Sequence, residues 1–179
     1  IAVSKLQMAA LARADMPESV VAAARDKFYL RHLNTGEFFL VPGADPNEIG
    51  IVLKGLMRAY FTGTKGNDVT KLFAKPGEFV ASYAALLSGE PSKLTIQALR
   101  ETTLVCLKYS ELQRLYEVDP WWQIIGRKVA EQILIAREKR EYELLLLPAI
   151  ERYERFLKDF PELVDMIPQW QIASYLGIT

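Results

Sequence analysis

The chain has 179 residues, and its 22 lysines and arginines are balanced by 22 aspartates and glutamates. Half of the residues are hydrophobic, which supplies a core for one domain plus a remainder and excludes global disorder. The neutral balance excludes a strongly basic nucleic-acid-binding coat. A single cysteine and a single histidine exclude an internal disulfide, a cysteine-rich zinc or iron–sulfur site and a histidine-rich metal site.

The first residues favour short helices. Leu6, Ala9 and Ala10 have helical spacing, and Pro17 followed by Glu18 predicts the start of a second helix. No apolar run of the chain approaches the roughly 18 residues of a membrane span, and no signal peptide is visible. We therefore expect a cytoplasmic protein with no membrane partner.

Glycine punctuates the middle of the chain, where eight of the ten glycines lie between residues 36 and 89. Runs rich in β-branched and aromatic residues accompany them, and an early strand is also expected around residues 29–33. The runs are Phe38–Val41, Ile49–Lys54, Met57–Phe61, Val69–Phe73, Thr95–Leu99 and Thr103–Lys108. Short strands separated by glycine turns are typical of an antiparallel sandwich or barrel.

A long helix follows the predicted barrel. Ser110 is expected to cap a first helix, and Asp119 followed by Pro120 predicts the start of a helix that extends to Leu147. Its apolar residues form a narrow seam close to coiled-coil spacing, so we predict a dimer interface with the same helix of a second subunit. The alternative is that the helix packs on its own domain. The seam consists of Trp122, Ile125, Val129, Ile133 and Ala136.

The last segment has the pattern of a helix-turn-helix that is cut at its turn. Pro148 predicts the start of a helix that closes at Phe160, and a further helix is expected from Gln169. Gly177 suits the left-handed end of that helix, and Thr179 suits the cap of the next one. We therefore expect the recognition helix, with its base-reading residues, to follow the given sequence.

Four strings in this order resemble the Crp/Fnr family of bacterial transcription regulators. They are GEFFLVPG at residues 36–43, IVLKGLMR at 51–58, PGEF at 76–79 and IASYLGIT at 172–179. The resemblance extends from about Phe28 to Thr179. It implies an α+β fold in which a cyclic nucleotide-binding-like jelly roll, or double-stranded β-helix, spans 1–118. A dimerisation helix then spans 119–147, and the start of a winged helix-turn-helix spans 148–179.

The resemblance also identifies candidates for an effector pocket. Members of the family bind the ribose of cyclic AMP through a glutamate and its phosphate through an arginine, and these positions fall on Ser82 and Ser92 here. We therefore expect no binding of cyclic AMP in the usual way. The two serines either contact another ligand or are solvated loop residues, and the pocket either holds another small molecule or is packed shut by Tyr83 and its neighbours. The candidates are Gly77, Glu78, Ser82, Tyr83, Ser92 and Lys93.

Other chemistries lack their residues. Cys106 lies in a β-rich run and is expected to be a buried thiol, and His32 is expected to have a structural hydrogen bond rather than a haem. A metal-binding cupin-like enzyme needs more than one histidine, and every catalytic triad would have to use His32. We expect no catalytic residues, no metal and no cofactor.

The sequence thus predicts a dimeric, effector-gated transcription regulator that binds DNA. The resemblance places Gln169 and Thr179 at helix ends that approach DNA phosphates, where free backbone amides suit an anion, whereas Trp170 is expected to pack in the protein. The alternative is a ligand-binding or signalling module that has the same barrel and does not bind DNA. The motif at residues 169–179 distinguishes the two.

Overall fold

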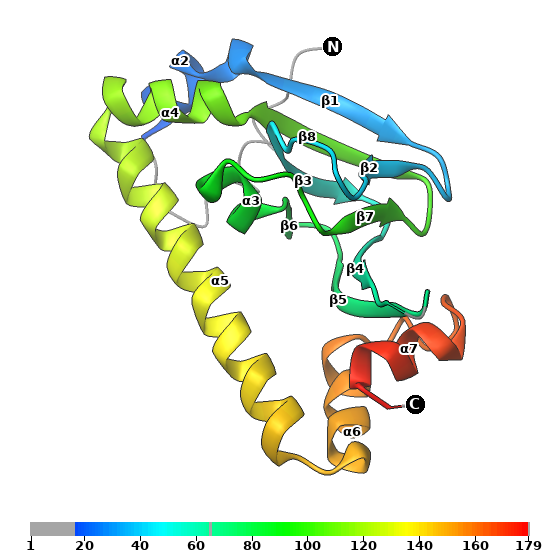
Figure 1. Cartoon of the computed structure of the whole chain (residues 1–179). Coiled ribbons are helices and arrows are strands. Elements are labelled where there is room, and N and C mark those ends of the chain that lie inside the picture. The colour runs from blue at the N-terminus through cyan, green and yellow to red at the C-terminus, as the bar shows by residue number, and fades with distance from the viewer. Residues whose placement is uncertain (1–16, 65, 179) are drawn as a thin grey trace.

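The computed structural model describes residues 17–64 and 66–178, and Figure 1 shows its barrel, its long helix and the two helices that follow. The helices are α2 (Glu18–Ala23), the 3₁₀ turn η1 (Arg25–Lys27), α3 (Tyr83–Ser88), α4 (Tyr109–Val118), α5 (Pro120–Leu146), α6 (Ala149–Asp159) and α7 (Gln169–Leu176). The strands are β1 (Phe28–Leu33), β2 (Phe38–Leu40), β3 (Glu48–Lys54), β4 (Met57–Thr62), β5 (Asp68–Ala74), β6 (Phe79–Val80), β7 (Thr95–Ala98) and β8 (Thr102–Lys108).

The strands form two antiparallel sheets, ordered β1-β8-β3-β6 and β2-β7-β4-β5. Buried residues from both sheets form one core, which includes Val52, Met57, Ile96 and Leu104. The predicted jelly roll is therefore confirmed. The two-residue strand β6 was missed, because the sequence favoured the entry to a helix at that place.

Gly55 makes the turn between β3 and β4, as the sequence predicted. Its φ is +100°, and an added Cβ would lie 2.4 Å from the backbone oxygen of Glu101. A side chain is excluded there both by the left-handed backbone and by the neighbouring chain.

The start of α5 lies where the sequence predicted it, and its cap residue is the aspartate Asp119. The Asp119 carboxylate accepts a hydrogen bond from the Trp121 amide at 2.9 Å, and Pro120 begins α5, which runs for 27 residues. Two other expectations were wrong. Pro17 precedes α2 as its cap residue, and α4 begins at Tyr109, directly after β8, so that Ser110 lies inside the helix.

The first turns of α5 pack against the barrel of the same chain. Trp122 and Ile125 are buried, and the Trp122 ring lies 6.1 Å from the Phe28 ring. These two residues therefore belong to the core of the protomer, contrary to the expectation that they face a partner. Gly126 fits the same packing, because an added Cβ would lie 2.3 Å from the Tyr116 hydroxyl.

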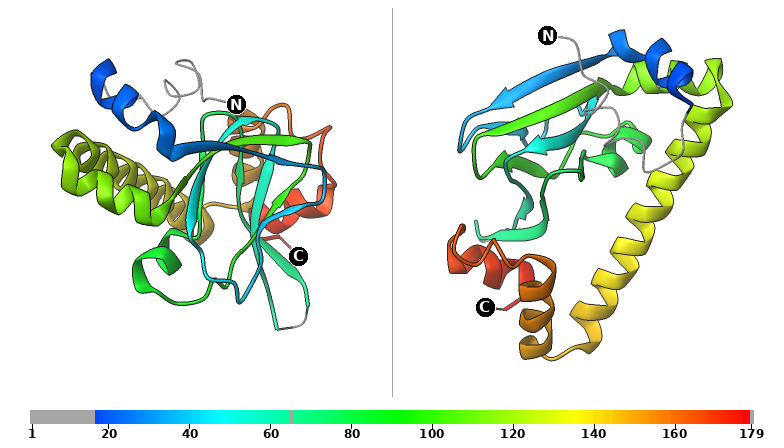
Figure 2. Two further views of the ribbon diagram at one scale, coloured as in Figure 1. Left: turned by 90° about the horizontal axis from the view of Figure 1, so that it is seen from above. Right: turned by 180° about the vertical axis from the view of Figure 1, so that it is seen from behind.

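The chain reverses after α5, and α6 and α7 return to the barrel beside β5 (Figure 2). Ile167 and Ile172 share a core with Leu56 and Phe73 of the barrel. No helix within residues 17–64 and 66–178 is long and apolar enough to cross a membrane. The described chain also contains no cluster of histidine, cysteine, aspartate or glutamate side chains that would hold a metal ion.

Candidate functional site

The segment around β6 and α3 holds the predicted effector residues. Gly77 has a φ of +88° and donates its amide hydrogen bond to the Val52 carbonyl at 2.8 Å. The Glu78 carboxylate accepts a hydrogen bond from the Lys75 amide at 2.9 Å, so Glu78 stabilises its own turn. Lys93 is exposed.

Ser82 and Ser92 are brought together by the fold. Both are buried, and the Ser92 hydroxyl donates a hydrogen bond to the Ser82 hydroxyl at 2.9 Å. Ser92 also accepts a hydrogen bond from the Leu94 amide at 3.0 Å. The interpretation as solvated loop serines is therefore wrong. The two positions satisfy one another, and neither offers a charge to a ribose or a phosphate.

A groove of about 730 Å³ lies between the barrel and α5. Tyr83 lines this groove, so it does not close the space, and burial raises the pKa of its hydroxyl. Most of the wall is apolar and comes from strands of the barrel and from one face of α5. Its members include Phe28, Ile49, Ile51, Phe73, Phe79, Leu107, Val129, Ile133 and Ala136. All five residues of the predicted dimer seam line this groove.

Part of the groove wall is charged, and its charged side chains are those of Lys71, Arg137, Arg140 and Glu141. Burial lowers the pKa of Lys71, and the charge of Arg137 lowers it further. Burial also lowers the pKa of Arg140, whose guanidinium lies 4.0 Å from the centre of the Tyr175 ring. The charged part of the groove wall therefore carries three cations and one carboxylate, whereas Ser82 and Ser92 carry no charge.

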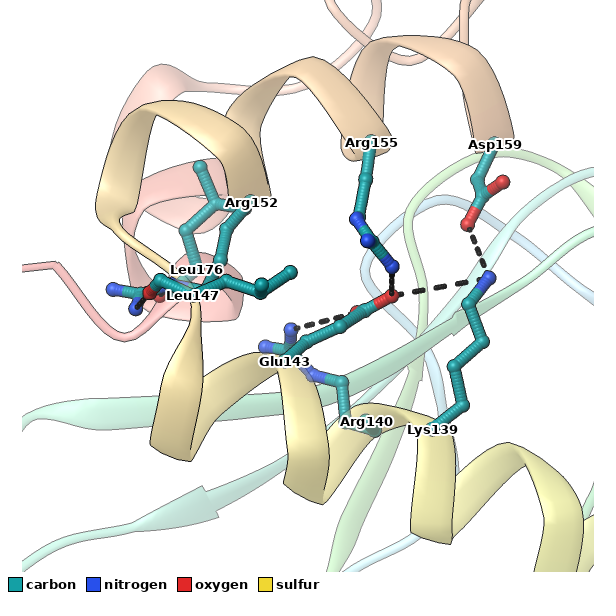
Figure 3. Close-up of polar contacts among 8 residues, drawn as sticks. All are labelled: Lys139, Arg140, Glu143, Leu147, Arg152, Arg155, Asp159 and Leu176. Carbon is teal, nitrogen blue, oxygen red and sulfur yellow. Dashed lines mark hydrogen bonds and ion pairs between the residues drawn. The ribbon is translucent and has the colours of Figure 1, made fainter.

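Ionic contacts join the end of α5 to α6, as Figure 3 shows. Glu143 is buried, and its carboxylate lies 3.4 Å from Arg155 and 3.9 Å from both Lys139 and Arg140. Lys139 also pairs with Asp159 at 3.2 Å. A carboxylate with three cationic neighbours fixes the angle of the turn between the two helices.

Arg152 of α6 holds the same turn through the backbone (Figure 3). It donates hydrogen bonds to the Leu147 carbonyl at 2.7 Å and to the Leu176 carbonyl at 2.8 Å. The first carbonyl lies just after α5 and the second ends α7. One guanidinium therefore connects the turn to the last described helix.

α7 is also attached to the barrel. The Ser174 hydroxyl accepts a hydrogen bond from the Thr70 amide at 2.9 Å and donates one to the Asp68 carbonyl at 2.8 Å. Both groups belong to β5, the edge strand of its sheet. The rings of Phe73, Phe156 and Tyr175 pack around this contact.

Arg58 is a buried cation that sequence reasoning missed. It donates hydrogen bonds to Thr70 and Asp68, each at 3.0 Å, and its guanidinium lies 4.2 Å from the centre of the Tyr60 ring. The guanidinium also lies 4.9 Å from the centre of the Trp170 ring, which is 52% exposed, so Trp170 covers Arg58 at the surface and is not a core residue. No local pattern signals this residue, because its partners come from other strands and from α7.

The remaining candidates have simple positions. Gln169 is exposed at the first position of α7, and Gly177 ends this helix with a φ of +65°. Thr179 and the helix predicted from Leu6 lie outside the described residues. Cys106 is a core residue whose pKa is raised to about 12 by burial. His32 is exposed and lies 3.1 Å from the Thr103 hydroxyl.

Comparison with protein families matches residues 30–119 to the cyclic nucleotide-binding domain. The chain belongs to this family. The matched residues are the barrel and α4, and they include both serines of the altered pocket. A comparison with curated protein sequences finds no match.

Solved structures share the fold beyond the matched domain. The regulator FixK2 from Bradyrhizobium japonicum is similar with a TM-score of 0.75 and 20% identity, over 85% of this chain and 78% of that one. The Xanthomonas campestris regulator CLP gives a TM-score of 0.71 and 16% identity, over 91% and 86%. The Thermus thermophilus catabolite activator protein gives 0.64 and 20%, over 95% and 81%. The fold is that of Crp/Fnr-type regulators, and its neighbours are regulators rather than enzymes.

Proposed function

We propose that this chain is the sensor, the dimerisation helix and the start of the DNA-binding head of a transcription regulator without enzymatic activity. The observation that carries the proposal is α7, a short helix held beyond α5 and ended by Gly177 in the left-handed conformation. A following helix that starts at this turn would complete a helix-turn-helix. A barrel that served only as a ligand-binding module would not need this segment.

The exposed surface of α5 supports a dimer. Leu134 is 57% exposed and Leu145 is 72% exposed. They lie about three helical turns apart on nearly the same face of the helix. Leucines exposed in this way on a long helix suit the same helix of a second copy, and a symmetric dimer would present two heads to two half-sites of DNA.

The pocket around Ser82 and Ser92 supports a sensor that does not bind cyclic AMP in the usual way. A cyclic phosphate requires a cationic partner, and the buried Ser92 hydroxyl is engaged by Ser82 and Leu94. A calorimetric titration with cyclic AMP should therefore show no saturable binding at micromolar concentrations.

The DNA-binding role is tested by selection from a random DNA library with the full-length protein. We expect a two-fold symmetric site to be enriched, with half-sites about one helical turn apart. Gln169→Ala should weaken binding to the enriched site, whereas Gln132→Ala, an exposed glutamine on α5, should leave it unchanged. Failure to enrich any sequence would favour the ligand-binding or signalling module.

A further inference from the structure

Two cations that line the groove beside α5 form no salt bridge with any residue that the structure describes. Lys71 lies where the pairing of β4 and β5 skips a residue, because Ala59 pairs with Leu72 and Tyr60 pairs with Thr70. Such a bulge changes the direction of the extra side chain. Lys71 lines the groove, and Arg137 lines it from α5.

The surroundings of these two cations do not neutralise them. Within residues 17–64 and 66–178, neither Lys71 nor Arg137 forms a salt bridge. The Lys71 ammonium lies 5.9 Å from the centre of the Phe61 ring, which is a weak contact for an exposed charge. Of the other charges that line the groove, Arg140 is engaged by Tyr175 and Glu143, and Glu141 adds one carboxylate against the two cations Lys71 and Arg137.

The walls of the groove define the rest of the ligand. Phe73, Phe79 and Ile133 contribute apolar surface along the space between barrel and helix. A volume of about 730 Å³ is within the range of sites that bind organic molecules. An apolar groove with cations in one part of its wall favours a molecule with an apolar body and one anionic group.

We propose that the groove binds an organic anion, such as an aromatic or aliphatic carboxylate or sulfonate, with its charged group between Lys71 and Arg137 and its body against the barrel and α5. The anionic group is held by β5 and α5, whereas the segment that contains Ser82 contributes uncharged wall residues such as Ala81 and Tyr83. Its role as an effector rests on the proposed function, but its binding does not.

This placement couples the ligand to the parts of the molecule that hold the head. Lys71 follows Thr70, whose amide donates to Ser174 of α7. Arg137 lies on α5 less than two helical turns before Glu143, the carboxylate that pairs with Lys139. An anion that draws Lys71 and Arg137 together would pull on the edge strand and on α5 at the same time, and α7 is attached to both.

A pair of fluorescent dyes tests the charged end separately from the apolar body. The probes are 8-anilinonaphthalene-1-sulfonate and N-phenyl-1-naphthylamine, which share the same body and differ in the sulfonate. We expect Lys71→Met and Arg137→Met each to weaken binding of the sulfonate about tenfold, the effect of losing a charged partner, and to change binding of the neutral dye less than about twofold. Lys128→Met, which removes an exposed cation of α5 outside the groove, should change neither.

Each other outcome contradicts the proposal. Equal sulfonate binding by wild type and both variants means that the two cations hold no anion, and equal losses for both dyes mean that the variants altered the groove itself. Circular dichroism and the urea unfolding midpoint establish that the variants are folded. If only a monomeric variant such as Leu134→Asp, which lies outside the groove lining, binds the dyes, a second copy of the chain fills the groove. These measurements contain no DNA, so failure of the DNA selection leaves their result unaffected.

Discussion

The two ends of α5 are held by different forces. At its first turns Trp122 and Ile125 are buried against the barrel, and Asp119 caps the helix. At its last turns Glu143 is surrounded by cations, and Arg152 holds the chain that follows. Apolar packing does not rearrange readily, because a buried ring has no alternative packing partner nearby. The exposed pair of Lys139 and Asp159 exchanges partners readily and weakens with salt, whereas the buried Glu143 carboxylate is screened less.

This difference separates the fixed part of the molecule from the part that is able to change. The start of α5 moves only with the barrel, whereas its end meets α6 and α7 through contacts that a ligand or a partner subunit can replace. A change sensed in the groove would therefore be expressed at the end of α5 and not at its start. Four measurements test whether the two ends of α5 differ in this way.

The largest effect is expected from charges on the exposed face near the end of α5. In Leu134→Asp/Leu145→Asp, two carboxylates would be buried in the proposed dimer, which is strongly unfavourable without partners. Light scattering coupled to a sizing column should give the mass of a monomer. Val118→Asp, an equally exposed apolar position at the end of α4, should remain dimeric. A double variant that stays dimeric would contradict the interface.

Next in size is the loss of the ring that anchors the start of α5. Trp122→Ala should lower the free energy of unfolding by about 3–5 kcal/mol, because it leaves a cavity between Phe28 and the helix. Urea denaturation measures this, and the loss should be similar at low and high salt. Val118→Ala is the control, with a change below about 0.5 kcal/mol. A loss below about 1 kcal/mol would mean that packing does not anchor this end.

A smaller and local effect is expected at the turn after α5. Arg152→Ala removes charged hydrogen bonds to two carbonyls, which are worth about 1.5–3 kcal/mol each before solvent replaces them. Hydrogen exchange should accelerate in α6 and α7 but not in the barrel, and the difference from wild type should be smaller at high salt, where the contact is already weakened. Arg155→Ala, which removes one pair at 3.4 Å, should have the lesser effect. Equal acceleration throughout the chain would mean that the head and the barrel unfold as one unit.

The smallest effect is a dependence on alkaline pH at the start of α5. Burial raises the pKa of Tyr116 to about 12, above the value of about 10 for a free tyrosine. The folded state therefore favours the neutral hydroxyl, and this contribution is complete below pH 10 and is lost as the pH rises through 12. Tyr116→Phe should make the fall in the free energy of unfolding shallower over this range. Cys106 contributes to the same fall, because its pKa is raised in the same direction. An unchanged slope would show that Tyr116 titrates as an exposed group.

Local signals in the sequence predicted the strands and the main helix. Glycine turns such as Gly55 and the cap at Asp119 depend on neighbours in the chain, so their outcome follows from a few residues. The resemblance also indicated that the pocket lacks the glutamate and the arginine of the family, because Ser82 and Ser92 stand at those positions. That the two hydroxyls bind each other was not, because their positions in the fold decide it.

The contacts of α5 and α7 could not be predicted in the same way. The spacing of Trp122 and Ile125 marks an apolar face, but spacing alone does not say whether that face meets the same chain or a partner. The bonds between Ser174 and β5 join residues more than 100 positions apart. The residues next to Ser174 in the sequence do not distinguish it from an exposed serine. Arg58 and Glu143 are also buried by contacts with other elements of the fold, which the sequence around them does not indicate.

The position of Ser174 on β5 has a further consequence for solubility. β5 is an edge strand, and Ser174 occupies its outward Thr70 amide and Asp68 carbonyl. Unoccupied edges pair readily with strands of other molecules, so proteins commonly cover them. Any state in which the head leaves the barrel would uncover this edge. The docked α7 therefore covers part of this edge, and in the proposed regulator a released α7 would require DNA, a partner subunit or another cover for the strand.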